Sequence, residues 1–188
     1  HSEICKPRDL FAPERQNSAG LDLADDSVLE ALAAGINAAP QQWTATPSVS
    51  GTPAKGPTRP VTNPADRRDI VGHVTYATPD TLTLVVDTAQ KGFADWAAQP
   101  PAMRADCLLR AADMLEARHP TLMALICREA GKSLPNAVAE IREAVDFLRY
   151  YAATIRRDFT NATHIPLGVV ACISPWNFPL AIFIGQIA

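Results

Sequence analysis

A turn at residues 174–179 holds the side chains whose types and spacing are best suited to catalysis. This turn, Ser174-Pro-Trp-Asn-Phe-Pro179, directly follows an apolar run at residues 169–173. An Asn side chain such as Asn177 can donate a hydrogen bond to the oxyanion of a tetrahedral intermediate. Ligands of open α/β sheets collect at the carboxyl ends of strands, so a turn after a buried strand suits this role. The alternative is an Asn that bonds only to the backbone of its own turn.

The neighbours of Asn177 can contact a cofactor. Pro175 and Trp176 can form a wall beside one, or can equally pack in the core next to a turn. Ile173 and Ser174 can offer backbone carbonyls to a ribose. No Gly-x-Gly-x-x-Gly motif follows the apolar run, so the usual dinucleotide fingerprint does not contribute to this hypothesis.

Two charged candidates lie on or at the end of predicted helices. Glu143 is placed opposite the apolar stripe of its helix, where it can line a pocket or be a solvated surface residue. The segment Glu129-Ala-Gly-Lys132 looks like a charged site, but helix-end chemistry also explains it. Gly131 favours a left-handed cap, and Lys132 favours the negative end of the helix dipole.

The composition of the chain limits the classes of protein to which it can belong. The 188 residues are 47% hydrophobic and 20% charged, which is enough for one modest domain with a core. The net charge is −3, and the sequence has neither a basic stripe nor a long apolar run. These features argue against nucleic-acid binding and against a membrane span. The four cysteines lack metal-ligand spacing, so we expect no metal site and reduced, buried thiols in a cytoplasmic protein.

Hydrophobic periodicity predicts a helix-rich α/β chain around these residues. We expect strands at 70–76, 163–166 and 168–174, and an extended, weakly ordered Pro-rich linker at 40–64. We expect helices at 27–38, 78–98, 102–118, 120–131 and 135–158. Asp26 or Ser27 would cap the first and Thr78 the second. The apolar stripe of the last helix comprises Ile141, Ala144, Val145, Leu148, Ala152 and Ile155.

Several motifs together resemble the aldehyde dehydrogenase superfamily. They are Pro60–Asp66 followed by Val71–Val74, then Glu129–Lys132, Arg149–Ala152 and the stretch 168–180 with its Pro-Trp-Asn-Phe-Pro turn. A narrower resemblance rests on Ala139–Tyr151 and on the opening at residues 4–23, which contains Arg15-x-Asn-Ser-x-Gly20. These segments resemble the Δ1-pyrroline-5-carboxylate dehydrogenase module of the bacterial bifunctional proline utilization A (PutA) family.

The resemblance implies a fold and a reaction. Residues 60–188 would form the helix-rich amino-terminal part of an incomplete NAD-binding domain, with the first strand of its Rossmann-like sheet. Residues 1–59 would form an irregular opening segment, a short helix and a Pro-rich linker. The implied reaction oxidises L-glutamate γ-semialdehyde, a small-molecule substrate, to L-glutamate with NAD+. By motif, Asn177 matches the oxyanion donor, Ile173, Ser174, Pro175 and Trp176 match cofactor contacts, and Glu143 and Phe178 match substrate contacts.

The resemblance also implies parts outside this chain. The nucleophilic Cys and the general-base Glu of the family follow the turn at a distance, so we expect the isolated chain to be inactive. Cys172 precedes the turn and is not expected to be the nucleophile. The parent would be a cytoplasmic homo-oligomer, with FAD only in a proline dehydrogenase module of the same polypeptide. The alternatives are a stand-alone aldehyde dehydrogenase with another substrate and a non-catalytic structural or oligomerisation module.

Overall fold

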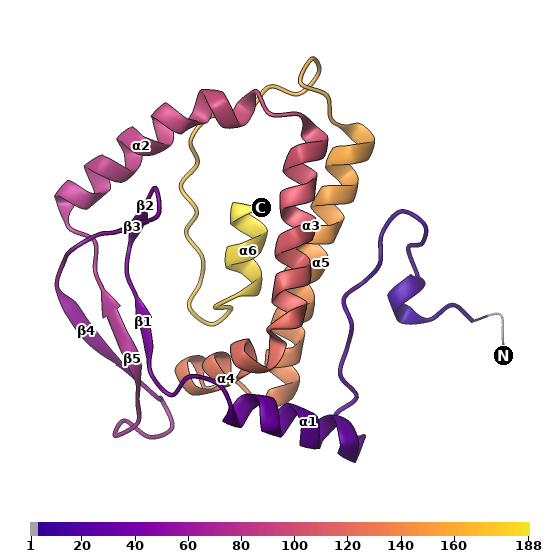
Figure 1. Ribbon diagram of the computed structural model, residues 1–188, viewed down its shortest axis with the longest axis vertical. Coiled ribbons are helices and arrows are strands. Elements are labelled where there is room, and N and C mark those ends of the chain that lie inside the picture. Colours follow the sequence, from indigo (N-terminus) through magenta and orange to yellow (C-terminus); the bar gives the residue numbers. More distant parts are fainter. Residues whose placement is uncertain (1–3) are drawn as a thin grey trace.

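The computed structural model describes residues 4–188 and shows helices packed beside a small mixed sheet (Figure 1). This architecture confirms the helix-rich α/β class predicted from the sequence. In chain order the elements are η1 (Pro7–Asp9), α1 (Asp26–Asn37), β1 (Trp43–Ala45), β2 (Ser48–Val49), β3 (Thr52–Pro53), β4 (Thr58–Thr62), β5 (Ile70–Thr75), α2 (Pro79–Ala97), α3 (Pro101–Ala117), α4 (His119–Ala130), α5 (Leu134–Asp158) and α6 (Ala181–Ile187).

The longest helix, α5, organises the body of the molecule. It lies beside α3, and the chain runs in opposite directions along the two helices (Figure 1). The predicted apolar stripe of α5 is buried, except that Ile155 is only half-buried. It packs with residues of α1, α3 and α4 in one core cluster: Leu32, Ala112, Met123, Ile126, Ala137, Ile141, Val145 and Leu148. Because Ala112 and Ala137 are fully buried and small, the helices can approach closely.

Local sequence explains where several helices begin and end. Thr78 caps α2, and Gly131 ends α4 in a left-handed conformation with φ 67°, both as predicted. The cap of α1 is a correction, because Asp25 rather than Asp26 or Ser27 occupies that position. The Asp25 carboxylate accepts hydrogen bonds from the backbone N–H groups two and three residues further on. Two adjacent aspartates followed by a serine left the position of the cap open in the sequence.

The predicted strand at 70–76 is present as β5 and forms the centre of a three-stranded sheet. β1 pairs parallel to it and β4 pairs antiparallel to it. Both outer strands come from the Pro-rich stretch 40–64, which we expected to be weakly ordered. The physical reason for this correction is that its extended backbone finds hydrogen-bond partners on β5. Pro60 is tolerated because β4 lies at an edge of the sheet.

The strands predicted at 163–166 and 168–174 are not formed. The segment runs extended and then turns back into α6, a helix that the sequence analysis did not anticipate (Figure 1). A strand needs hydrogen-bonded neighbours, and within residues 4–188 no other strand pairs with this segment. Its apolar side chains are therefore open to solvent, and Leu167 and Ile173 are 97% and 85% exposed.

The opening segment docks on the helices. The backbone N–H and hydroxyl of Ser18 donate to the two carboxylate oxygens of Asp146 on α5, at 2.6 and 2.9 Å. The backbone N–H of Ala19 donates to Glu116 on α3 at 2.6 Å. These bonds join residues near the start of the chain to the two helices that support the rest of the molecule.

Candidate active-site turn

The turn that carries Asn177 joins the extended segment to α6. Residues 176 and 177 form a turn, as the sequence predicted, and the side chains of Pro175, Trp176 and Asn177 are exposed. Trp176 is 82% exposed, so its ring does not pack in the core. The turn thus presents an amide and an aromatic face that are accessible to a ligand.

Glu140 holds the carboxyl-terminal side of this turn. Its side chain is only 2% exposed, and it extends from α5 toward the start of α6. One carboxylate oxygen, Oε2, accepts hydrogen bonds from the backbone N–H groups of Leu180 and Ala181, at 3.2 and 2.9 Å. These donors lie three and four residues after Asn177 in the chain. Because the first backbone N–H groups of a helix have no partner within the helix, the carboxylate satisfies two of them.

Lys132 completes this arrangement. Its ammonium lies 2.5 Å from Oε1 of Glu140 and 4.6 Å from the centre of the Phe178 ring. The sequence left open whether Lys132 belongs to a charged site or serves the end of the preceding helix, and the ion pair with Glu140 favours the charged site. A buried carboxylate costs free energy unless a charge and hydrogen bonds compensate it, and Lys132 supplies that charge. The same ammonium faces the aromatic side chain of the turn.

A second contact holds the amino-terminal side of the turn. The side-chain amide of Gln186 on α6 donates to the carbonyl oxygen of Ile173 at 3.1 Å. The thiol of Cys172 donates to the carbonyl oxygen of Gln186 at 3.3 Å. A carbonyl oxygen has two lone pairs, so the Ile173 oxygen can accept a second hydrogen bond.

Glu143 lies one turn of α5 beyond Glu140 and is exposed. It lines a hollow of about 520 Å³ together with Arg15, Ala139, Arg142, Asp146, Phe147 and Tyr150. None of residues 173–178 lines this hollow. Glu143 and the Asn177 turn therefore do not share this hollow.

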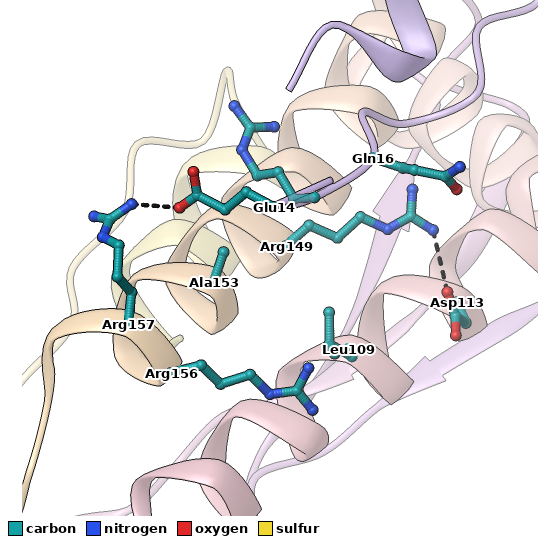
Figure 2. A pocket seen from close by; sticks show the side chains of 9 residues that line it. Glu14, Gln16, Leu109, Asp113, Arg149, Ala153, Arg156 and Arg157 are labelled. Carbon is teal, nitrogen blue, oxygen red and sulfur yellow. Dashed lines mark hydrogen bonds and ion pairs between the residues drawn. The ribbon is translucent and has the colours of Figure 1, made fainter. Parts of the chain in front are cut away.

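An arginine-rich hollow of about 480 Å³ lies where the opening segment crosses α3 and α5 (Figure 2). Figure 2 shows Arg149 directed toward Asp113 and Arg157 directed toward Glu14. Arg156 is likewise paired with Asp106. Three of the four arginines that line the hollow therefore already have carboxylate partners.

Arg149 also sets the ionisation of Glu116 beside this hollow. Burial disfavours the charged form of Glu116, but hydrogen bonds from Arg149 and from the backbone N–H of Ala19 outweigh it and lower the pKa of Glu116. The Arg149 and Glu116 side chains are 2.7 Å apart at their closest N and O atoms. This pair is structural, because it joins α3, α5 and the opening segment.

The cysteines are all free, but they are less buried than predicted. Cys5 is exposed, and Cys107, Cys127 and Cys172 are half-buried. Burial raises the pKa of Cys127, which makes its thiol less reactive. Within residues 4–188, His, Cys, Asp and Glu side chains form no cluster that could hold a metal ion. In the same range no helix is both long and apolar enough to cross a membrane.

Glu140 is the site residue that the sequence analysis missed, together with its pairing to Lys132. A signal was present, because Glu140 falls within the apolar stripe of α5, between buried Ala137 and Ala144. A charged residue on a buried helix face needs a partner. The sequence does not identify that partner, because Lys132 precedes the helix and the two backbone N–H groups come from 40 residues further on.

Known proteins resemble this chain in sequence and in fold. Residues 52–188 match the aldehyde dehydrogenase family. The bifunctional protein PutA of Escherichia coli (strain K12) is 51% identical over all of this chain, which corresponds to 14% of that protein. A 1-pyrroline-5-carboxylate dehydrogenase of Anoxybacillus flavithermus is 41% identical over 65% of this chain and 26% of its own length. A crystal structure of a bifunctional proline utilization A protein matches all of this chain and 18% of its own, with 36% identity and a TM-score of 0.74.

Proposed function

Because the chain belongs to the aldehyde dehydrogenase family, we propose that it is the amino-terminal part of a module that oxidises L-glutamate γ-semialdehyde. The product is L-glutamate and the hydride acceptor is NAD+. The observation that carries this proposal is the 51% identity to a bifunctional PutA protein over the whole chain. The match to a 1-pyrroline-5-carboxylate dehydrogenase supports the same substrate, because γ-semialdehyde is the hydrated, open form of pyrroline-5-carboxylate.

Asn177 is proposed to stabilise the oxyanion. A thiolate from another part of the polypeptide adds to the aldehyde carbon, and the electron pair of the C=O bond moves to oxygen. The exposed side-chain amide of Asn177 donates a hydrogen bond to that oxygen. Bound NAD+ supplies the acceptor for the hydride that leaves the same carbon. Water then cleaves the thioester, which releases the carboxylate and regenerates the thiolate.

The residues before Asn177 are proposed to contact the cofactor. Ile173 and Trp176 are 85% and 82% exposed, so their apolar surfaces are open to a planar ring or a ribose. The carbonyl oxygen of Ile173 accepts one hydrogen bond from Gln186 and can accept another. Pro175 is exposed and rigid, and the side chain of Ser174 is half-buried. These properties fit an NAD+ site that lacks a glycine-rich phosphate loop.

Glu143 and Phe178 are proposed to contact the substrate. γ-Semialdehyde carries an α-ammonium group, and the exposed carboxylate of Glu143 can attract it directly or through water. Phe178 directly follows Asn177 and is 38% exposed, so its ring can pack against the alkyl part of the aldehyde. The remaining parts of the substrate pocket would come from the polypeptide outside this chain.

The parent protein is proposed to be larger than this chain. The chain spans 14% of the length of the PutA protein from Escherichia coli (strain K12). We propose that residues 60–188 begin the NAD-binding domain, and that residues 1–59 lead into it from a proline dehydrogenase module that holds FAD. The parent would be a homo-oligomer in the cytoplasm. Free thiols such as those of this chain are typical of cytoplasmic proteins.

An assay of the complete polypeptide tests this function. We expect NADH to form when NAD+ and pyrroline-5-carboxylate are added, at a higher kcat/KM than with propanal. A higher kcat/KM for propanal would instead indicate an aldehyde dehydrogenase with another substrate. If neither aldehyde yields NADH, the segment has a structural role. The isolated 188-residue chain serves as the control and should produce no NADH.

A further inference from the structure

We propose that Glu140 is a positioning residue that holds Asn177 where the oxyanion develops, with Lys132 as its charge partner. This inference deepens the proposed function and rests on it. Glu140 does not reach the substrate. It acts through the backbone of Leu180 and Ala181, which directly follows the turn of Asn177.

Both oxygens of the Glu140 carboxylate are engaged. Oε1 pairs with the Lys132 ammonium at 2.5 Å, and Oε2 accepts the two backbone N–H groups of Leu180 and Ala181. The side chain is 2% exposed, whereas that of Lys132 is 17% exposed. Hydrogen bonds to a charged acceptor are stronger than those between neutral groups, and they are stronger still away from water. The contact therefore ties the start of α6 firmly to α5.

This tie matters because the turn has few other supports. The side chains of Trp176 and Asn177 are exposed and so cannot anchor it by burial. The contacts described above hold it from both ends, with Gln186 on the carbonyl of Ile173 before it and Glu140 after it. Lys132 adds a third point at Phe178. A displacement of a catalytic group by about 1 Å can lower a rate by about 10²-fold. We therefore expect kcat to depend on the position of this turn.

We assign this role to Glu140 because a charged carboxylate on a buried helix face costs free energy. A purely structural position on a buried helix face is normally apolar, as Ala137, Ile141 and Ala144 are around it. A buried carboxylate at this point satisfies two backbone donors that an apolar side chain could not. The arrangement specifies where α6 begins, and hence where Asn177 lies, more than it increases stability.

A double-mutant cycle in the complete polypeptide tests the inference. We expect Glu140→Gln to lower kcat for γ-semialdehyde by about 10–100-fold, because Gln keeps the shape but leaves Lys132 without a counter-charge. In the Asn177→Ala background the same substitution should change kcat by less than about threefold, because the group that it positions is gone. A merely structural contribution would lower kcat by the same factor in both backgrounds, and that additive result would overturn the proposal. So would an unchanged kcat in Glu140→Gln alone.

The cycle separates this inference from the proposed function. If Asn177→Ala by itself leaves kcat unchanged, the oxyanion role is wrong and the positioning role is lost with it. If Asn177→Ala lowers kcat but Glu140→Gln acts additively, only the positioning role is wrong. Asp69→Asn is a matched control, because it breaks a similar ion pair, with Arg128 at 2.6 Å, away from the turn. That variant should keep kcat within about threefold of the parent.

Hydrogen exchange provides a readout that does not depend on catalysis. The backbone N–H groups of Leu180 and Ala181 should exchange about tenfold faster in Glu140→Gln, whereas those of α2 should be unchanged. If Glu140→Gln fails to fold, the pair Glu140→Gln with Lys132→Met removes both charges and retains an acceptor for the two backbone N–H groups. Because a neutral amide is a weaker acceptor than a carboxylate, both N–H groups should still exchange faster than in the parent in that double variant. Unchanged exchange in whichever of the two variants folds would contradict the proposed contact.

Discussion

The carboxylate of Asp146 on α5 accepts two hydrogen bonds from Ser18, one from its backbone N–H at 2.6 Å and one from its hydroxyl at 2.9 Å. The residues are 128 positions apart in the chain. Ser18 is only 4% exposed, although it belongs to an irregular segment. The contact therefore holds the opening segment against α5 at a buried residue.

We predict that Asp146→Ala releases this segment from the body of the protein. Loss of a charged acceptor for two hydrogen bonds should cost about 1.5–3 kcal/mol of local stability. Trypsin should then cleave after Arg8 and Arg15 about 10–150-fold faster than in the parent. The exposed Asp87 on α2 offers a control, and Asp87→Ala should leave the cleavage rate unchanged. Equal rates in the parent and in Asp146→Ala would show that other contacts hold the segment.

The pair of Glu116 and Arg149 predicts a loss of stability in acid. Hydrogen bonds hold the pKa of Glu116 below its ordinary value in the folded state. Its contribution is therefore fully present above the unfolded carboxyl pKa of about 4.3, and it is lost as the pH falls through the lower, folded pKa. Thermal midpoints measured from pH 7 downward should fall less steeply below about pH 4.5 in Glu116→Gln than in the parent. Parallel curves for the two proteins would contradict this assignment.

Asn177 should affect the chemical step rather than cofactor binding. In the complete enzyme we expect Asn177→Ala to lower kcat by about 10²–10³-fold, the usual cost of losing one oxyanion donor. The affinity for NAD+ should change little, because the amide acts on the substrate oxygen. Stopped-flow and equilibrium NAD+ binding measure the two quantities separately. A kcat within about threefold of the parent would return Asn177 to the role of a simple turn residue.

Glu143 should affect substrate choice. We predict that Glu143→Ala raises KM for γ-semialdehyde about tenfold, which corresponds to about 1.4 kcal/mol of lost binding. Propanal lacks the ammonium group that Glu143 would attract, so its kcat/KM should be much less affected. The measurement is the ratio of kcat/KM for the two aldehydes in parent and variant. An unchanged ratio would identify Glu143 as a solvated helix residue.

The sequence by itself determined helices α1 to α5 of this protein and several of their ends. The stripe from Ile141 to Ala152 and the signals at Thr78 and Gly131 act within a few residues, so their effect can be predicted without knowledge of the fold. The Pro-Trp-Asn-Phe-Pro turn was recognisable for the same reason. Its residue types and their order can be read from the sequence without knowledge of the surrounding structure.

Tertiary structure decided the pairings between distant segments. β1 and β4 form because the backbone groups of a Pro-rich stretch meet β5, whereas the apolar run at 169–173 has no such neighbour within residues 4–188. Glu140 is the clearest example. The sequence of α5 reveals a charged residue on a buried face, but it does not reveal the partners of that residue. Its partners, Lys132 and the backbone N–H groups of Leu180 and Ala181, come together only when α6 packs on α5. Hydrogen bonds and ion pairs depend on distances of a few ångströms, and these distances are set by packing rather than by position in the sequence.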